Sequence, residues 1–565
     1  MSSSIRTLLD VLSHIVISFT RGVTEHYNPQ QSKYTEAESL GYSPLESTGQ
    51  EWYRHGDPDE ECIYQEYRDG EATSLDHRAR PRSLDIRFIN ASSTEENDEV
   101  QEDDEDENGR MYWKRLRPSA LRTVCKSMYI GALISLLTAI IIGLVYMMSC
   151  YLCFTTVNNC EFYPKESIPV RVQWTRLLSA VISTVFLYPS FFGCMLFLLG
   201  RDRLKGVKRK MGLVICFAWF VDTIYRVVLL ALGISHSKLS TLQKIPLNIW
   251  FSMSVFCEAY LLMRHFSLLR TSCKQRLALF LQLTVPFCSI IFLAVPLVTI
   301  IYPLYNKQSK ESNLRLVIAL FAPLIGVLFK VISRIFVQRL GETAHPGYSC
   351  ALLAPLYCVS AIMFRVLQAD LDSLESMAVL GIIHGATEVI ERSTMAVIDH
   401  ICHVIYKRKS VPWGSLRTPR CERLMADIVI MSMLFESSAI VSVNGLLYLY
   451  RYIYLKDEFL VELLHSFAIT TSVQLVIEWF FTSVSLAIET RYQNIAVMAV
   501  WQRRWKRHIS MAVGAILASA LWISANLLDM AHERFEVPSN QPCKMPFAEN
   551  FGRSIAPPEQ CTPHC

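Results

Sequence analysis

The sequence predicts an all-helical integral membrane protein, a polytopic bundle of about eleven transmembrane helices preceded by a disordered acidic arm. Three observations lead to this fold class. Hydrophobic residues make up 51% of the 565 residues, whereas charged residues make up only 19%, below the ~25% of an average soluble protein. Long apolar stretches recur from residue 127 onward. Clusters of basic residues separate these stretches in alternation, as expected of a chain that crosses a membrane repeatedly.

Each apolar stretch is near the ~20 residues that cross the ~30 Å hydrocarbon core of a bilayer as a helix. The eighth stretch is the weakest by hydropathy because it contains seven ionisable residues. Without it the charge alternation described next would break, so we retain it. The predicted spans are 127–153, 176–200, 211–233, 246–267, 277–302, 315–337, 349–368, 376–406, 425–449, 461–488 and 509–530.

Basic residues gather in every second loop. The loop 201–210 holds six of them, and others gather before the first span, after the eighth and before the eleventh. The intervening loops are poor in positive charge, and the loop 369–375 has none. Because cytoplasmic loops concentrate Lys and Arg, this pattern predicts a bundle over 113–530 with its N-terminus in the cytoplasm. The tail 531–565, which contains three cysteines, is then non-cytoplasmic.

The segment before the bundle has two parts. Residues 1–22 show an amphipathic pattern, typical of a helix that lies on a membrane or docks on a partner. The alternative is a short helix packed on the cytoplasmic face of the bundle itself. Residues 23–112 are rich in acidic and small polar residues, so we expect them to be disordered. Within them, Tyr42 to Leu45 fits a tyrosine-based sorting signal, and Ser83 follows an arginine-rich stretch typical of kinase sites. The alternative for each motif is a solvated tail without partners.

The eighth span concentrates its ionisable residues on one face. At about 100° per residue, a helix places His384, Glu388, Glu391, Arg392 and Asp399 within a stripe of about 120°. A charged residue at the bilayer centre costs about 2.5–3.5 kcal/mol on insertion scales. The stripe therefore cannot face lipid, and we expect it to face other helices or a pore.

Other spans offer partners for this stripe. Asp222 on the third span has Arg226 four residues later, the spacing of a helical ion pair. Glu258, Glu436 and Glu478 lie on the fourth, ninth and tenth spans. All of these residues are candidates for a transport pathway, in which the carboxylates and His384 would bind a cation or relay protons. The alternative is a structural network of buried ion pairs.

Two further patterns concern the spans that carry these partners. Lys330 lies in the inner half of the sixth span and Arg365 near the outer end of the seventh, and the long side chain of either could snorkel to its interface. Prolines are expected to interrupt the fifth, sixth and seventh spans, as in the broken helices that line the binding sites of many transporters. These are Pro286, Pro296, Pro323 and Pro355.

A metal site is a weaker hypothesis. His384, Glu388 and Glu391 share one face and suit a divalent transition metal, and Asp399, His400 and His403 form a second candidate. Neither set matches a known zinc motif, so no metal is assigned and no cofactor is expected. The cysteines within spans are interpreted as small apolar residues.

Several function classes lack their signatures in this sequence. It contains no glycine-rich phosphate loop and no serine nucleophile motif, so an ATP-driven pump and an enzyme are not expected. Topology explains the basic loops, so no nucleic-acid partner is expected either. The preferred function is a secondary transporter or channel for a cation or small polar solute, in the plasma membrane or an endomembrane. The alternatives are a lipid scramblase and a non-transporting scaffold or receptor.

Overall fold

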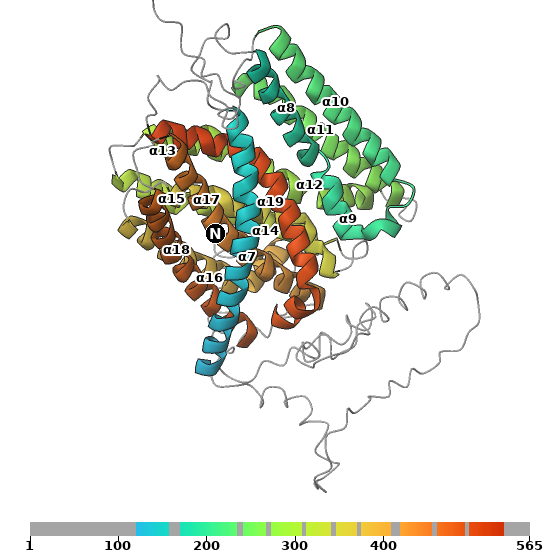
Figure 1. The fold of residues 1–565 in the computed structure, drawn as a ribbon. Helices are drawn as coiled ribbons and strands as arrows, with labels where there is room; N and C mark the ends of the chain where they lie inside the picture. The colour runs from blue at the N-terminus through green and yellow to red at the C-terminus, as the bar shows by residue number, and fades with distance from the viewer. Residues whose placement is uncertain are drawn as a thin grey trace, which may run out of the picture.

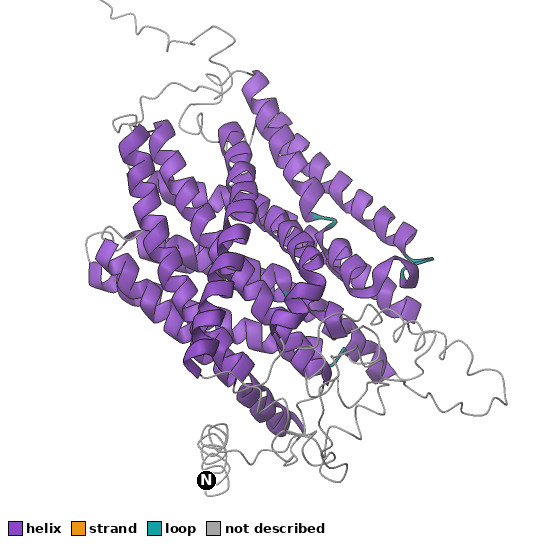
Figure 2. Ribbon diagram, turned by 60° about the horizontal axis from the view of Figure 1, so that its bottom comes forward, coloured by secondary structure: helices purple, strands orange, loops and turns teal. Residues whose placement is uncertain are grey.

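A computed structural model describes ten parts of the chain, and every regular element in them is a helix (Figure 2). The predicted amphipathic helix 1–22, the acidic arm 23–112 and the tail beyond Phe535 lie outside the described residues. The described ranges are 120–157, 170–233, 241–266, 273–307, 312–340, 346–369, 374–407, 419–454, 460–491 and 497–535.

The helices follow one another with short connections (Figure 1). They are α7 (Ala120–Val157), α8 (Val170–Leu187), α9 (Ser190–Arg203), α10 (Lys208–Ala231), α11 (Thr241–Phe266), α12 (Cys273–Pro296), the π-helix η5 (Leu297–Ile301), α13 (Tyr302–Lys307), α14 (Ser312–Gln338), the 3-10 helix η6 (Pro346–Leu352), α15 (Ala354–Ala369), α16 (Leu374–Lys407), α17 (Pro419–Tyr454), α18 (Leu460–Arg491) and α19 (Val497–Phe535).

All eleven predicted spans fall on helices, and eight helical segments within the described residues are long and apolar enough to cross a membrane. These segments are on α7, α8 with α9, α10, α11, α12, α14, α17 and α18. The remaining three predicted spans correspond to α15, α16 and α19. α15 has only 16 residues, and α16 carries the ionisable stripe.

The surface is apolar where that of a soluble protein would be polar. Large hydrophobic side chains such as Phe217, Leu328 and Val476 are more than half exposed. Many polar and charged side chains, including Arg334 and Glu489, are fully buried instead. Soluble proteins rarely expose extended apolar surface or bury charges at this frequency. This inverted distribution suits contact with lipid and supports a multi-pass membrane protein.

The centre of the bundle is formed by α15 and α17. Every residue of α15 is buried, and 94% of the most apolar part of α17 is buried. α17 packs against α7, α15, α18 and α19, while α15 also packs against α12, α14 and α16. In contrast, α8, α10 and α11 form an outer group on one side of the bundle (Figure 1). Polar residues on α15 and α17 are therefore enclosed by protein.

Contacts between distant segments bring basic helix ends together in two pairs. Arg507, near the start of α19, donates to the backbone carbonyl of Phe197 near the end of α9. Gln282, near the start of α12, donates to the carbonyl of Arg339 just after α14, at 3.0 Å. These contacts agree with the alternation of basic loops in the sequence.

The prolines act differently from one another. Pro296 ends α12 and is followed directly by the π-helix η5, so it marks a distortion of the predicted fifth span. Pro286 and Pro323 lie inside continuous helices. Pro355 lies at an interruption of the predicted seventh span, because the 3-10 helix η6 ends at Leu352 and α15 begins at Ala354. It occupies the first turn of α15, where its missing N–H has no helical partner to lose.

Gly385 on α16 allows close packing against α18. A Cβ at this position would lie 2.4 Å from a ring carbon of Phe481. We predict that Gly385→Ala lowers stability by about 1–3 kcal/mol through overpacking. Gly212 on α10 is the matched control, because a Cβ there meets nothing within 4 Å and alanine favours helix. Thermal unfolding in detergent would measure both, and equal melting temperatures would contradict the packing assignment.

Candidate functional site

A column of polar side chains follows α17 through the bundle. Five residues of this helix each contact a polar partner on another helix: Asp427, Ser432, Glu436, Asn444 and Tyr448. From the first to the last of these residues α17 rises about 30 Å, at 1.5 Å per residue. This length equals the thickness of the hydrocarbon core. The column is therefore long enough to cross a membrane.

Arg365 on α15 lies at the middle of this column between two carboxylates. Its Nε is 3.1 Å from Oε2 of Glu436 on α17, and one terminal nitrogen donates to Oε2 of Glu478 on α18. The other terminal nitrogen donates to Oε1 of Gln368 at 2.7 Å. Thr482 donates to the second oxygen of Glu478 at 3.0 Å. The guanidinium thus joins three helices at a buried point.

Arg392 on α16 forms a second buried ion pair. Its guanidinium binds both oxygens of Glu489 on α18, at 2.8 and 2.9 Å. The same side chain lies 3.5 Å from Oε1 of Glu388, one turn earlier on its own helix. Ser432 on α17 donates to that oxygen of Glu388 at 2.7 Å. Such two-pronged arginine–carboxylate pairs fix geometry as well as charge.

The third pair connects α14 to α16. Nζ of Lys330 is 3.6 Å from Oε2 of Glu391 and lies 4.9 Å above the ring centre of Tyr357 on α15. Arg334, one turn further along α14, is fully buried. The prediction that Lys330 and Arg365 snorkel to an interface is wrong, because both are buried and paired with glutamates. Internal carboxylates satisfy these cations at lower cost than bending toward water.

His384 stands at the edge of the network. Its Nε2 is 3.7 Å from Oε2 of Glu436, and its side chain is 16% exposed, more than its neighbours in the network. A small cavity of about 20 Å³ between α14, α15 and α16 is lined by His384, Arg365, Gln368 and Thr387. One water molecule needs roughly 10–15 Å³. The cavity can therefore bring a single water to the imidazole and the guanidinium.

Charges in the network do not balance without bound protons. Three cationic side chains, on α14, α15 and α16, pair with five carboxylates, on α16, α17 and α18. Negative charge left without a cation is costly in a low-dielectric interior, so protons bound by the carboxylates would stabilise this arrangement. The three cations are Lys330, Arg365 and Arg392, and the five carboxylates are Glu388, Glu391, Glu436, Glu478 and Glu489.

The stripe predicted on α16 is buried as expected. Glu388, Glu391 and Arg392 are at most 8% exposed, whereas Ile382 and Ile390 on the opposite face are 48% and 62% exposed. The side chain of Asp399, as well as those of His400 and His403, lies outside the described residues.

The structure brings six of the nine predicted site residues together around Arg365 and Arg392, and places two elsewhere. Asp222 pairs with Arg226 at 2.8 Å on the outer helix α10. Glu258 is buried on α11 beside Ser254. Neither helix packs against α16 or α18 among the closer helix pairs. These two residues therefore belong to the outer group of helices and not to the central network.

Sequence reasoning missed Glu489 and Gln368, and it gave Arg365 the wrong environment. Glu489 falls one residue beyond the predicted tenth span, where an acidic residue is expected to belong to a solvent-exposed loop. In the structure α18 continues to Arg491, so Glu489 is buried. Ser485 lies four residues before Glu489 and donates to it at 3.4 Å. This spacing is the only local pattern that could have indicated that Glu489 continues the polar face of the helix.

The metal hypothesis on α16 has no support in this geometry. Ser432 and Arg392 occupy an oxygen of Glu388, and Lys330 faces Glu391. Among the described residues, the potential ligand group is instead Cys350, Asp427 and His508.

No family model, no curated protein and no solved structure matches this chain.

We predict that Arg392→Gln destabilises the protein by about 3–5 kcal/mol, because it leaves the carboxylate of Glu489 buried without a charged partner. The double variant Arg392→Gln with Glu489→Gln removes both charges and should recover much of this loss. Arg209→Gln on the exposed start of α10 is the control and should have little effect. Chemical or thermal unfolding in detergent would check this, and additive losses in the double variant would contradict the pairing.

Proposed function

We propose that this chain is a proton-coupled secondary transporter for a cation or small polar solute, and not an enzyme. The single observation that carries the proposal is the polar column on α17, which is long enough to cross a membrane and holds ionisable groups from four neighbouring helices. Ionisable residues at this depth are costly and usually serve ion pathways or proton relays. A purely structural bundle would reach similar packing with apolar side chains.

The charge count supports a role for the proton. Three cations pair with five glutamates in the network, so protons on the glutamates or on His384 would offset the excess negative charge. Glu478 and Glu436 share Arg365, so protonation of either one frees the guanidinium to turn toward the other. In this proposal, a solute or cation that enters beside His384 competes with that proton. Such competition is the basis of coupled exchange.

The proposed orientation follows the distribution of basic residues. We propose eleven spans, with the N-terminus and the basic helix ends in the cytoplasm. α15, α16 and α19 cross with the eight apolar helices in this topology. α15 rises only about 24 Å, and the adjoining η6 helix extends it toward the basic side.

Two alternatives differ in what the column does. In a scaffold, the same ion pairs only hold the helices together, and the well-formed Arg392–Glu489 pair favours this possibility. In a scramblase, a polar stripe must be open to lipid headgroups. The α16 stripe faces α14, α17 and α18 instead, which disfavours the scramblase.

We predict that the purified protein, reconstituted in liposomes, carries protons across the membrane when a gradient of its solute is imposed. A panel of cations and small polar solutes is tested one at a time. Glu478→Gln should abolish the coupling, because an amide cannot take up the proton that the carboxylate exchanges. Glu388→Gln should weaken it. A pH-sensitive dye inside the vesicles measures the flux, and fluorescent lipid measured in parallel tests scrambling.

Asp222→Asn is the matched control for this experiment. It makes the same chemical change at a buried ion pair outside the column, so its flux should equal that of the wild type. Flux that is unchanged in folded Glu478→Gln and Glu388→Gln protein would reject the site. Absence of flux for every solute, in protein that unfolds cooperatively, would favour the scaffold.

A further inference from the structure

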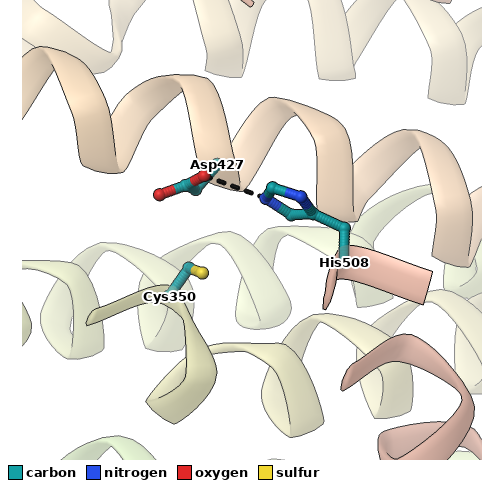
Figure 3. A group of neighbouring side chains, drawn as sticks. All are labelled: Cys350, Asp427 and His508. Carbon is teal, nitrogen blue, oxygen red and sulfur yellow. Dashed lines mark hydrogen bonds and ion pairs between the residues drawn. The ribbon is translucent and has the colours of Figure 1, made fainter. Parts of the chain in front are cut away.

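Three side chains from distant parts of the sequence meet near the basic end of the column (Figure 3). Cys350 comes from η6, Asp427 from α17 and His508 from α19, and all three are buried. One ligand atom of each lies within 4.8 Å of the others. Thiolate, carboxylate and imidazole are the three side-chain ligand classes that Zn²⁺ uses in proteins.

The hydrogen bonds of His508 indicate where a metal would bind. Its Nδ1 is 3.0 Å from the backbone carbonyl of Arg504, which can only accept, so Nδ1 carries the hydrogen. In the neutral ring Nε2 is then an acceptor, yet it lies 2.9 Å from Oδ1 of Asp427, another acceptor. Two facing acceptors at this distance require a proton or a metal ion between them. The bond from Nδ1 to a carbonyl is also the usual second contact of a metal-binding histidine.

Asp427 is ion-paired but not fully hydrogen-bonded. Its side chain is fully buried, and Oδ2 has no hydrogen-bond donor, although Nε of Arg423 lies 3.5 Å away. Buried carboxylate oxygens are normally hydrogen-bonded or bound to a cation. Cys350 lies on the other side of the carboxylate from the protein backbone of α17 (Figure 3). A cation between these groups would satisfy the carboxylate, the imidazole and the thiolate together.

The distances fit zinc after small side-chain movements. In a tetrahedral zinc site, with bonds of about 2.0–2.3 Å, neighbouring ligand atoms are roughly 3.3–3.6 Å apart. The pair formed by His508 and Asp427 would open by about half an ångström, and the thiol of Cys350 would move closer by about 1 Å. Both changes lie within the range of side-chain rotation.

A cysteine, a histidine and an aspartate also make up a nucleophilic triad, but the geometry does not suit one. A general base must offer one ring nitrogen to the cysteine. Nε2 of His508 faces Asp427 and Nδ1 faces the carbonyl of Arg504, so neither nitrogen faces Cys350. A metal ion, in contrast, takes the place of the proton between His508 and Asp427.

Basic residues lie close to this group. Nε of Arg423 is 3.5 Å from Oδ2 of Asp427. Zinc would displace two protons, that of the Cys350 thiol and the one between His508 and Asp427, so the net charge of the site would stay the same. The basic surroundings therefore do not prevent zinc binding.

We propose that Cys350, Asp427 and His508 form a zinc site that clamps η6, α17 and α19 together at the basic end of the bundle. The proposal is independent of transport, because Asp427 lies at the end of the column, about 13 Å along α17 from Glu436. Its metal would fix the position of the helix that carries the proposed pathway. It would also explain how three segments that are more than 70 residues apart in the sequence are held at one buried point.

The test uses the full chain, purified in detergent and titrated with Co²⁺ as a spectroscopic substitute for zinc. We expect a near-ultraviolet thiolate-to-cobalt band in the wild type, and its loss in Cys350→Ser. Cys358→Ser is the matched control, since Cys358 is equally buried eight residues further along but is not part of the group. Total zinc content alone does not discriminate, because the chain has 17 cysteines.

A second variant keeps the test decisive if Cys350→Ser fails to fold. His508→Gln retains the thiol, and we expect its cobalt affinity to fall more than about ten-fold. Chelation should lower the melting temperature of the wild type and of Cys358→Ser, but not that of His508→Gln. Identical cobalt spectra in the wild type, Cys350→Ser and His508→Gln would overturn the proposal. So would a wild-type spectrum without a thiolate band.

Discussion

The constraint on which this molecule depends is the cost of a charge inside a low-dielectric bundle. Arg365 lies on a helix of which every residue is buried, so its charge is within reach of at most a single water, in the small cavity beside His384. Only the two carboxylates brought by α17 and α18 make that position tolerable. Removing one partner of such a pair typically costs several kcal/mol. The relative positions of three central helices are therefore fixed by one guanidinium.

The same constraint explains which parts of the fold the sequence predicts. The eleven apolar stretches all fall on helices, because lipid-crossing segments must satisfy their own backbone and reveal this by length and composition. The burial of the α16 stripe follows from helical periodicity and the cost of exposing charge to lipid. Contacts between helices are different. Arg365 and Glu478 are separated by 113 residues, and no local pattern in either segment encodes their pairing.

Errors at single residues have the same origin. Lys330 and Arg365 look like snorkelling residues because each lies toward one end of an apolar stretch. The sequence does not reveal that each meets a glutamate from another helix inside the bundle. Glu489 looks like loop because the predicted span ends one residue before it. Cys350, Asp427 and His508 escape notice because their spacing far exceeds that of any metal-binding motif read from sequence.

The two proposals concern the middle and one end of the same column and constrain each other. In the transport proposal, the proton is exchanged at the glutamates that pair with Arg365. Glu436 on α17 and Glu478 on α18 must then change partners while the basic end of α17 stays in place. A clamp at Asp427 provides such a fixed point, because it ties α17 to η6 and α19 beyond the first helical turns. Motion along α17 would then be largest toward Asn444 and Tyr448, whose hydrogen bonds at 3.0–3.3 Å join uncharged side chains. Neutral bonds of this kind contribute only about 1 kcal/mol each, so they can open and close at little cost.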